Sequence, residues 1–183
     1  MKIRRHIKNR WSLLIIIGIY SCSNYSEEEY LDNEKPTILG TWEMESIHWI
    51  TKDTTYSIDE AQPGMLMLTS DSYSIMWTPT EEPRTPFQIL SKPTDEELKS
   101  GFGSIVFNGG TYKYSDSTIT TTAKIAKVPG FEGGKQFYNY KLSNNKMELT
   151  MFDEIYPDGT RPEWYGKFQT KFVLEKLSDT KKA

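Results

Sequence analysis

The chain has 183 residues, of which 37% are hydrophobic, and this length suits one domain with a substantial buried core. Its 22 basic and 25 acidic residues give a net charge of −3, which argues against a nucleic-acid-binding protein, because such proteins present a strongly basic surface. The single cysteine, Cys22, has no partner for a disulfide within the chain, which excludes a fold stapled by disulfides.

The N-terminal residues have the organisation of an export signal. The first ten residues contain five basic residues and no acidic one; the basic residues are Lys2, Arg4, Arg5, Lys8 and Arg10. An apolar stretch follows over residues 11–20, but about ten residues rise only about 15 Å as a helix, whereas a bilayer span needs about 20 residues. Residues 1–21 are therefore predicted to be a signal peptide and not a transmembrane helix.

The signal ends in Ile19, Tyr20, Ser21 and Cys22, which resemble a lipobox: an aliphatic residue, a small residue before the cleavage site, and cysteine after it. Tyr20 is bulkier than is usual at its position. The resemblance implies cleavage before Cys22 and lipid on its thiol, and each buried methylene would contribute about 0.8 kcal/mol of anchoring. The alternative is an ordinary signal peptide that happens to contain a cysteine. We expect a membrane-anchored lipoprotein of the outer membrane, facing either the periplasm or the cell exterior.

Residues 22–36 are predicted to be a flexible, lipid-anchored tether, because their hydrophobicity is low and like charges cluster in them. The acidic run Glu27, Glu28 and Glu29 resembles the surface-export signal of Bacteroides-type lipoproteins, and a plain solvated linker is the alternative. Loss of five basic residues with the signal leaves 17 basic against 25 acidic residues, a net charge of about −8. That charge argues against nucleic acid and against a body lying flat on anionic lipid, which leaves the anchor as the expected membrane contact.

Residues 37–178 are predicted to form one β-strand domain, followed by a disordered tail over residues 179–183. Apolar and polar residues alternate along the segments, and short turn sequences separate them. The predicted strands cover residues 39–50, 65–69, 73–77, 105–114, 118–128, 135–142, 147–151 and 165–177. Eight sequential strands joined mostly by short turns avoid exposed edges best by closing into an antiparallel up-and-down barrel. An open sandwich is the alternative.

One long insertion, residues 78–103, separates the third and fourth predicted strands. Its four prolines forbid regular strand pairing through much of its length. Thr94 and Glu97 fit a capping box, with Pro93 before it and Gly101 after it, so one short helix is predicted here. Long insertions in compact domains are often lids or binding loops, and a passive connection across one end of the barrel is the alternative.

The body resembles the lipocalin-like domains of the calycin superfamily. Gly40 and Trp42 match the Gly-x-Trp signature at the start of the first strand, and the Gly-Thr-Tyr sequence at 110–112, the run 136–142 and the strand 172–177 follow in the family's order. The resemblance implies an all-β, eight-stranded up-and-down barrel, in which Trp42 closes one end against a basic side chain of the last strand. The usual arginine is missing, so Lys171 or Lys176 would take its place, although lysine lacks the planar stacking surface.

Strand parity predicts which side chains project into this barrel. If the charged faces point to water, the inward set is Met44, His48, Tyr73, Trp77, Tyr138, Tyr140 and Phe172. An apolar and aromatic lining with a few polar tips is typical of small-molecule pockets, so these are candidate ligand-binding residues. Such a lining is also typical of a filled core, which is the favoured interpretation for any one of these residues. A cavity of about 300–1,000 Å³ would favour the pocket.

Catalysis and metal binding find little support in the sequence. Once the signal is removed, His48 is the one histidine left, and the chain has no cysteine nucleophile and no Gly-x-Ser-x-Gly turn. Asp153 and Glu154 are adjacent, but they lack the pattern of a calcium loop. No catalytic residue, metal ligand or cofactor is therefore expected.

The sequence favours a non-enzymatic lipoprotein that binds a small hydrophobic or amphipathic molecule inside the barrel. The first alternative is an interaction module that binds a protein or a glycan through the surface aromatics Trp49, Tyr56 and Trp164. An isomerase or hydrolase inside a similar barrel is a further and less favoured alternative.

Overall fold

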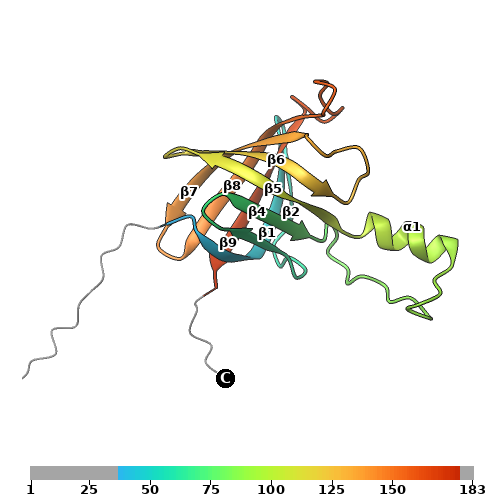
Figure 1. Cartoon of the computed structure of the whole chain (residues 1–183). Coiled ribbons are helices and arrows are strands. Elements are labelled where there is room, and N and C mark those ends of the chain that lie inside the picture. Colours follow the sequence, from blue (N-terminus) through green and yellow to red (C-terminus); the bar gives the residue numbers. More distant parts are fainter. Residues whose placement is uncertain (1–36, 178–183) are drawn as a thin grey trace, which may run out of the picture. The chain divides into compact units, whose positions relative to one another are not determined.

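A computed structural model describes residues 37–177, whose strands follow one another around a barrel (Figure 1). The elements in chain order are β1 (Gly40–Thr51), β2 (Thr55–Ile58), β3 (Met65–Leu68), β4 (Ser72–Trp77), α1 (Asp95–Gly103), β5 (Val106–Tyr114), β6 (Thr118–Ala126), β7 (Lys135–Ser143), β8 (Lys146–Ile155) and β9 (Phe168–Lys176). The predicted signal peptide, tether and tail lie outside the described residues, and so does Cys22.

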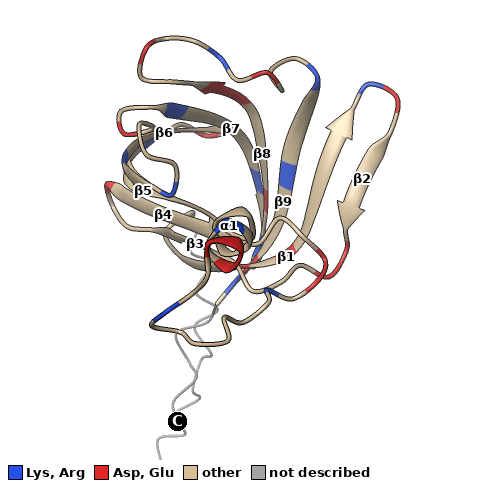
Figure 2. Cartoon of the chain, turned by 90° about the vertical axis from the view of Figure 1, so that its right-hand side faces the viewer, with Lys and Arg blue, Asp and Glu red and all other residues tan. Residues whose placement is uncertain are grey.

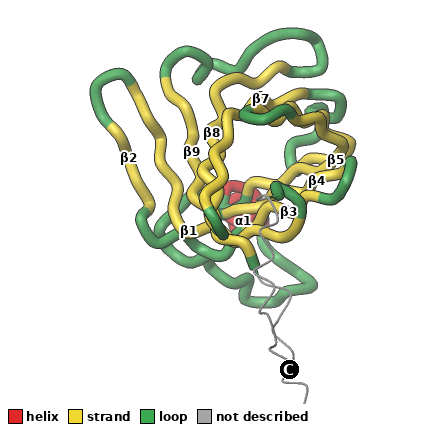
Figure 3. The backbone as a smooth tube through the Cα atoms, turned by 90° about the vertical axis from the view of Figure 1, so that its left-hand side faces the viewer, coloured by secondary structure: helices red, strands yellow, loops and turns green. Residues whose placement is uncertain are grey.

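Pairing between the first and last long strands closes the sheet. The strand order is β2-β1-β3-β4-β5-β6-β7-β8-β9, and β1 also pairs with β9, from Trp42 opposite Lys176 to Thr51 opposite Phe168. Without β2, the remaining eight strands form a closed antiparallel barrel, seen from one end in Figure 3. Closure removes the exposed sheet edges that an open sandwich would leave. The predicted all-β, eight-stranded up-and-down barrel is confirmed.

Strand β2 is an additional strand that the sequence pattern did not predict. Its four residues pair with the second half of β1, where Ile47 lies opposite Ile58, whereas β3 pairs with the first half, where Gly40 lies opposite Leu68. In Figure 2, β2 lies beside β1, outside the closed ring of eight strands. Only Ile58 of β2 is buried, so the strand lacks the alternation by which strands are recognised. Because of β2, the insertion lies between β4 and β5 in the observed order.

Three β-bulges interrupt the ladders of the barrel. The register shifts between Met44 and Ser46 in β1, opposite Gly109 and Gly110 in the β5–β6 pair, and opposite Phe137 and Tyr138 in the β7–β8 pair. The unpaired extra residue is Glu45 in β1, Lys124 in β6 and Phe152 in β8. Each bulge reverses which residues face the interior farther along its strand, because side chains alternate with a period of two.

The end of the barrel at which β1 begins is closed by side chains. Trp42 is fully buried, and its indole Nε1–H donates to the carbonyl oxygen of Ile38 at 2.8 Å. Of the two candidate lysines, Lys176 lies over Trp42, with Nζ 5.5 Å from the ring centroid, a distance that allows cation–π attraction. Gly40, at the start of β1, has a backbone φ of +126°, a value that residues other than glycine rarely adopt.

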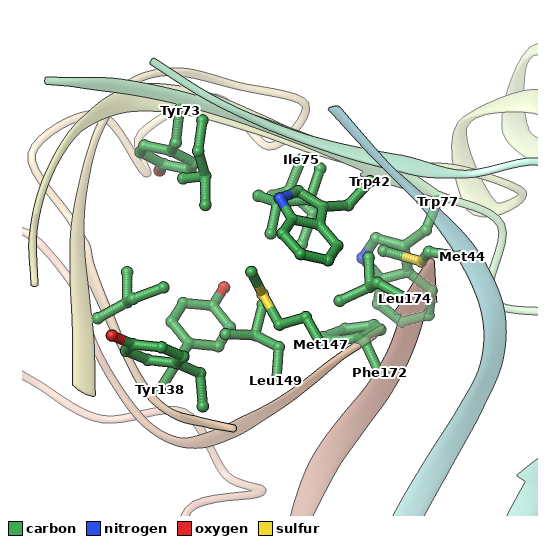
Figure 4. Packing of buried hydrophobic residues seen from close by; sticks show 14 of the residues in the cluster. Trp42, Met44, Tyr73, Ile75, Trp77, Tyr138, Met147, Leu149, Phe172 and Leu174 are labelled. Carbon is green, nitrogen blue, oxygen red and sulfur yellow. The ribbon is translucent and has the colours of Figure 1, made fainter. Parts of the chain in front are cut away.

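The interior above Trp42 is filled by large apolar side chains. Figure 4 shows Trp42, Met147, Leu149 and Phe172 pointing toward one another within the barrel. Trp77 packs against Phe172 edge to face, with ring centroids 5.1 Å apart. Aromatic pairs in this arrangement add to the stability that burial supplies.

The insertion carries the predicted helix, α1, and its capping box is present. Thr94 Oγ1 accepts from the backbone N–H of Glu97, and the Glu97 carboxylate accepts from the backbone N–H of Thr94. No residue of α1 is buried, so the cap and not a packed face defines where the helix begins. Among residues 37–177, no helix combines the length and the apolar character that crossing a bilayer requires.

Two predicted strand boundaries need correction at the other end of the barrel. β9 begins at Phe168 and not at residue 165, because residues 162–167 form turns closed by backbone hydrogen bonds from Tyr165 to Pro162 and from Lys167 to Trp164. β8 continues beyond residue 151 to Ile155, past the bulge at Phe152. The added length brings Glu154 opposite Gln136 of β7.

Candidate functional site

The centre of the barrel holds almost no free space. The cavity enclosed there has a volume of about 10 Å³, and its lining includes Leu66, Tyr73, Ile119 and Tyr138. One water molecule needs about 10–15 Å³, so a small-molecule ligand does not fit. The interior around the barrel axis is therefore a core and not a binding cavity.

Six of the seven candidate ligand-binding residues belong to this core. Met44, Tyr73, Trp77, Tyr138, Tyr140 and Phe172 are all buried. The phenol group of each of the three tyrosines donates a hydrogen bond within the protein. Tyr73 donates to Asn108 Oδ1 at 2.6 Å, and Tyr138 donates to Gln136 Oε1 at 2.7 Å. Tyr140 donates to the carbonyl oxygen of Ser115 at 2.7 Å. Met44, Trp77, Tyr140 and Phe172 are thus packing residues, while Tyr73 and Tyr138 reach the polar groups described below.

His48 does not project inward, which corrects the seventh prediction. The bulge at Glu45 reverses the parity of β1, so that Ile47 enters the core and His48 turns to the outer face. There its ring nitrogens form hydrogen bonds with Ser46 Oγ at 2.9 Å and Ser57 Oγ at 2.8 Å. The sequence carries one signal of this bulge: the adjacent polar residues Glu45 and Ser46 break the alternation, which passes from Trp42 and Met44 to Ile47 and Trp49.

A large pocket with a mostly apolar lining lies at the other end of the barrel, opposite Trp42. Its volume is about 610 Å³, within the usual range for small-molecule sites. Apolar and aromatic residues dominate its wall, which is made by the start of β5, the loop after β6 and the loop after β8, and these residues are Val106, Phe107, Ala126, Val128, Pro129, Phe131, Tyr156 and Pro157. Figure 2 shows the barrel from this end, where α1 also lies.

Asn108, Gln136 and Glu154 contribute the polar groups of the pocket, on the side of the barrel core. Gln136 Nε2 donates to Glu154 Oε2 at 2.6 Å, and Gln136 Oε1 accepts from Tyr138. Asn108 Oδ1 accepts from Tyr73. The hydrogen bonds from the two tyrosines therefore hold the amide groups of Asn108 and Gln136 in place, and the Gln136 amide holds the carboxyl group of Glu154. The polar face is thus preorganised before any ligand binds.

Burial shifts the pKa of the titratable groups around this polar face. Desolvation raises the pKa of Glu154 above its usual value, and the nearby charge of Asp153 adds to the shift, while the hydrogen bond from Gln136 opposes it. Burial also raises the pKa of Tyr73 to about 12 and that of Tyr138 well above its usual value. Both phenols therefore stay protonated. Glu154 is the group of this polar face whose charge would depend on the ligand in the pocket.

The cations near the pocket are engaged elsewhere. Lys127 lines the pocket, but its Nζ donates to the carbonyl oxygen of Phe102 at 2.8 Å and lies 4.4 Å from the centroid of the Phe102 ring. Arg161 binds both carboxylate oxygens of Asp153 at 3.0 Å. Lys127 thus ties α1 to the pocket wall, and Arg161 neutralises Asp153 and not Glu154.

A comparison with protein-family models identifies the fold's relatives. Residues 39–174 match the model of a family described as a lipocalin-like domain. The chain belongs to the lipocalin-like domain family. Domains of this family generally bind small hydrophobic ligands, typically without catalysis. A search of curated proteins finds none that matches the chain.

The pocket residues of this lipocalin-like domain were largely missed by sequence reasoning. Gln136 has the same parity as Tyr138 and Tyr140, so extending the inward set by two residues would have found it. Glu154 has the opposite parity to Met147 and Leu149, because the bulge at Phe152 lies between them. In the sequence, Glu154 therefore stands out only as part of an acidic pair with Asp153.

Two of the three candidate surface aromatics are used in packing. Trp49 is partly buried, with its ring centroid 6.2 Å from that of Trp77, and Trp164 stacks on Phe168 at 5.5 Å. Tyr56 on β2 is the freely exposed one of the three. Residues 37–177 also contain no group of three or more His, Cys, Asp or Glu side chains placed to hold a metal ion.

Proposed function

We propose that this lipocalin-like domain binds a small, partly apolar molecule in the pocket at the open end of its barrel. The observation that carries the proposal is the pocket itself: about 610 Å³, with apolar walls and a preorganised polar face on one side. Such a composition is typical of sites that bury an apolar body and orient it through a few polar contacts. Because the core is packed, we propose the site at the end of the barrel and not in the barrel interior, where the sequence suggested it.

We also propose that the protein is a lipoprotein anchored through Cys22 in the outer membrane. The export signal, the lipobox-like residues and the acidic run support this proposal, and all of them precede the described residues. Within the described residues, Leu177 donates its backbone N–H to Thr41, so the first and last residues of the domain lie at the Trp42 end. A tether attached there would leave the pocket at the far end of the domain, open to ligands.

A binding experiment with one blocking variant tests the proposed site. Val106→Trp adds an indole to the pocket wall, and Val173→Trp makes the same change on the outer face of β9. We expect the unmodified protein and Val173→Trp to bind the neutral fluorophore Nile red equally. Val106→Trp should bind it about 5- to 150-fold more weakly, because fitting the ligand beside the added indole costs about 1–3 kcal/mol.

Fluorescence titration measures these affinities, and native mass spectrometry of the purified protein shows whether a small molecule is retained from the cell. Thermal unfolding confirms that each variant is folded. Equal binding by Val106→Trp and the unmodified protein would place the ligand elsewhere and refute the proposed site. Failure of the unmodified protein to bind any of several apolar probes would do the same.

A further inference from the structure

The Glu154 carboxyl group has an environment that an apolar ligand alone does not explain. It lies in the pocket, half-enclosed, and accepts one hydrogen bond from Gln136. The ion pairs among residues 37–177 are Lys146 with Glu45 and Arg161 with Asp153. No cation of the described chain therefore compensates Glu154, although a carboxylate taken out of water is costly unless it is paired.

In the part of the chain that the structure describes, none of the other charged and titratable groups around Glu154 directs a positive charge to its carboxyl group. Asp153 lies beside it on β8 and is paired with Arg161, and Tyr156 follows the end of that strand. Tyr138 lies on β7 and Tyr73 on β4, and the two other charged residues of the pocket lining are Lys127 and Asp158. Burial raises the pKa of all three tyrosines, so they remain neutral. Hydrogen bonds from Thr160 lower the pKa of Asp158, which stays ionised at the rim. Lys127 is directed to the carbonyl oxygen of Phe102.

We infer that the pocket selects ligands that carry a protonated amine on an apolar body, with the amine paired to the carboxylate of Glu154. The inference rests on the proposed function and names its ligand class. An ammonium group would supply the missing positive charge and donate to the carboxylate, a charge-assisted hydrogen bond of the stronger kind. The apolar body would lie along Val106, Val128 and Phe131.

Other head groups fit this pocket less well. A carboxylate or phosphate would face Glu154 and Asp158 and would have no free cation to pair with, since Lys127 is engaged by Phe102. A neutral alcohol can donate one hydrogen bond to Glu154, but it leaves the carboxylate charge uncompensated. The expected order of affinity is therefore amine, then alcohol, then carboxylate, for ligands of equal chain length.

A matched series of ligands tests this order. Decylamine, decanol and decanoate share one apolar chain and differ in the head group. Displacement of Nile red is measured for the unmodified protein, for Glu154→Gln and for Glu148→Gln, which removes the same charge from the outer face of β8. Decylamine should bind the unmodified protein and Glu148→Gln alike. Glu154→Gln should lose about 10- to 100-fold in affinity for decylamine and little for decanol.

The pH dependence of the unmodified protein provides a second measurement that needs no variant. The ratio of decylamine to decanol affinity should rise as pH increases through the pKa of Glu154, because only the ionised carboxylate pairs with the ammonium group. It should then stay level until the amine itself loses its proton. A ratio that does not change between pH 4 and pH 8 would contradict pairing with Glu154.

The outcomes separate this inference from the proposed function. Equal affinities for decylamine and decanol, or an unchanged decylamine affinity in Glu154→Gln, would overturn the amine inference. The proposed function would survive in that case if Val106→Trp still weakened both ligands. If none of the three ligands displaced Nile red, or if Val106→Trp had no effect on them, both the site and the inference would fail.

Discussion

Trp42 is the single residue on which the closed end of the barrel depends most. It is fully buried, donates a hydrogen bond to Ile38 and lies beneath Lys176. We predict that Trp42→Ala lowers the free energy of unfolding by about 3–5 kcal/mol, the usual cost of removing a large buried aromatic side chain. Chemical denaturation followed by circular dichroism measures this change.

Two milder substitutions separate the contributions at this position. Trp42→Phe keeps an aromatic ring but loses the indole N–H, and should cost less than Trp42→Ala. Lys176→Met keeps much of the aliphatic chain over the ring and removes the charge, so it should cost about 0.5–1 kcal/mol or less. A Trp42→Ala protein as stable as the unmodified one would show that the closed end contributes little to stability.

The protonation of Glu154 makes the stability of the protein depend on pH. Its pKa is raised in the folded protein above the usual 4.5, so the folded state holds this proton more tightly than the unfolded state does. Stability therefore falls as pH rises from the unfolded-state pKa through the folded-state pKa, and the full cost is present above both. Glu154→Gln removes this cost.

We expect Glu154→Gln to unfold at a higher temperature than the unmodified protein at pH 7, and the difference to vanish at pH 3. Thermal unfolding at both values measures it, with Glu148→Gln as the control for loss of a surface charge. A destabilised Glu154→Gln protein at pH 7 would mean that the ionised carboxylate is better compensated than its contacts indicate.

At the scale of elements, α1 is held by its cap and by one lysine. None of its residues is buried, while the capping box of Thr94 and Glu97 satisfies its first turn and Lys127 contacts its end at Phe102. We predict that Thr94→Ala costs about 1 kcal/mol of helix stability but leaves the unfolding temperature of the barrel unchanged. Hydrogen exchange should accelerate in residues 95–103 alone, whereas Thr80→Ala in the same insertion should have no such effect.

The β5–β6 pair depends on a glycine at its bulge. A Cβ atom on Gly110 would lie 2.1 Å from the carbonyl oxygen of Thr122 and 2.7 Å from the backbone nitrogen of Lys124, so neither neighbour could move without breaking the ladder. Gly110→Ala should therefore destabilise the protein by about 3 kcal/mol or more. Gly103→Ala meets no atom within 4 Å and serves as the control, expected to be neutral or slightly stabilising.

For the whole molecule, the remaining prediction concerns its place in the cell. Cys22→Ser removes the thiol that would carry lipid, and Ser23→Ala alters the next residue while keeping that thiol. We expect Cys22→Ser to move from the membrane fraction to the soluble fraction and to lose incorporation of labelled fatty acid, and Ser23→Ala to behave as the unmodified protein. A Cys22→Ser protein that stays in the membrane fraction would require another mode of attachment.

Much of the fold could be predicted from local patterns. Eight strand segments and the cap at Thr94 are each encoded by neighbouring residues, and the structure contains all of them. β2 was missed, since three of its four residues are exposed and it is held by pairing with β1. The candidate site was predicted less well, because its members come from β5, β7 and β8 and meet only at the end of the barrel.

The sequence by itself determined the number and order of the barrel strands, the place of the insertion and the residues that would supply the core. These follow from alternation, turn residues and capping residues, which act over a few positions. Only the tertiary structure decided that the core is full and that the pocket lies at the barrel's end. It also turned His48 outward and Glu154 toward the pocket, because one extra residue at Glu45 and one at Phe152 reverse the parity of a strand, and bulges arise from pairing between strands.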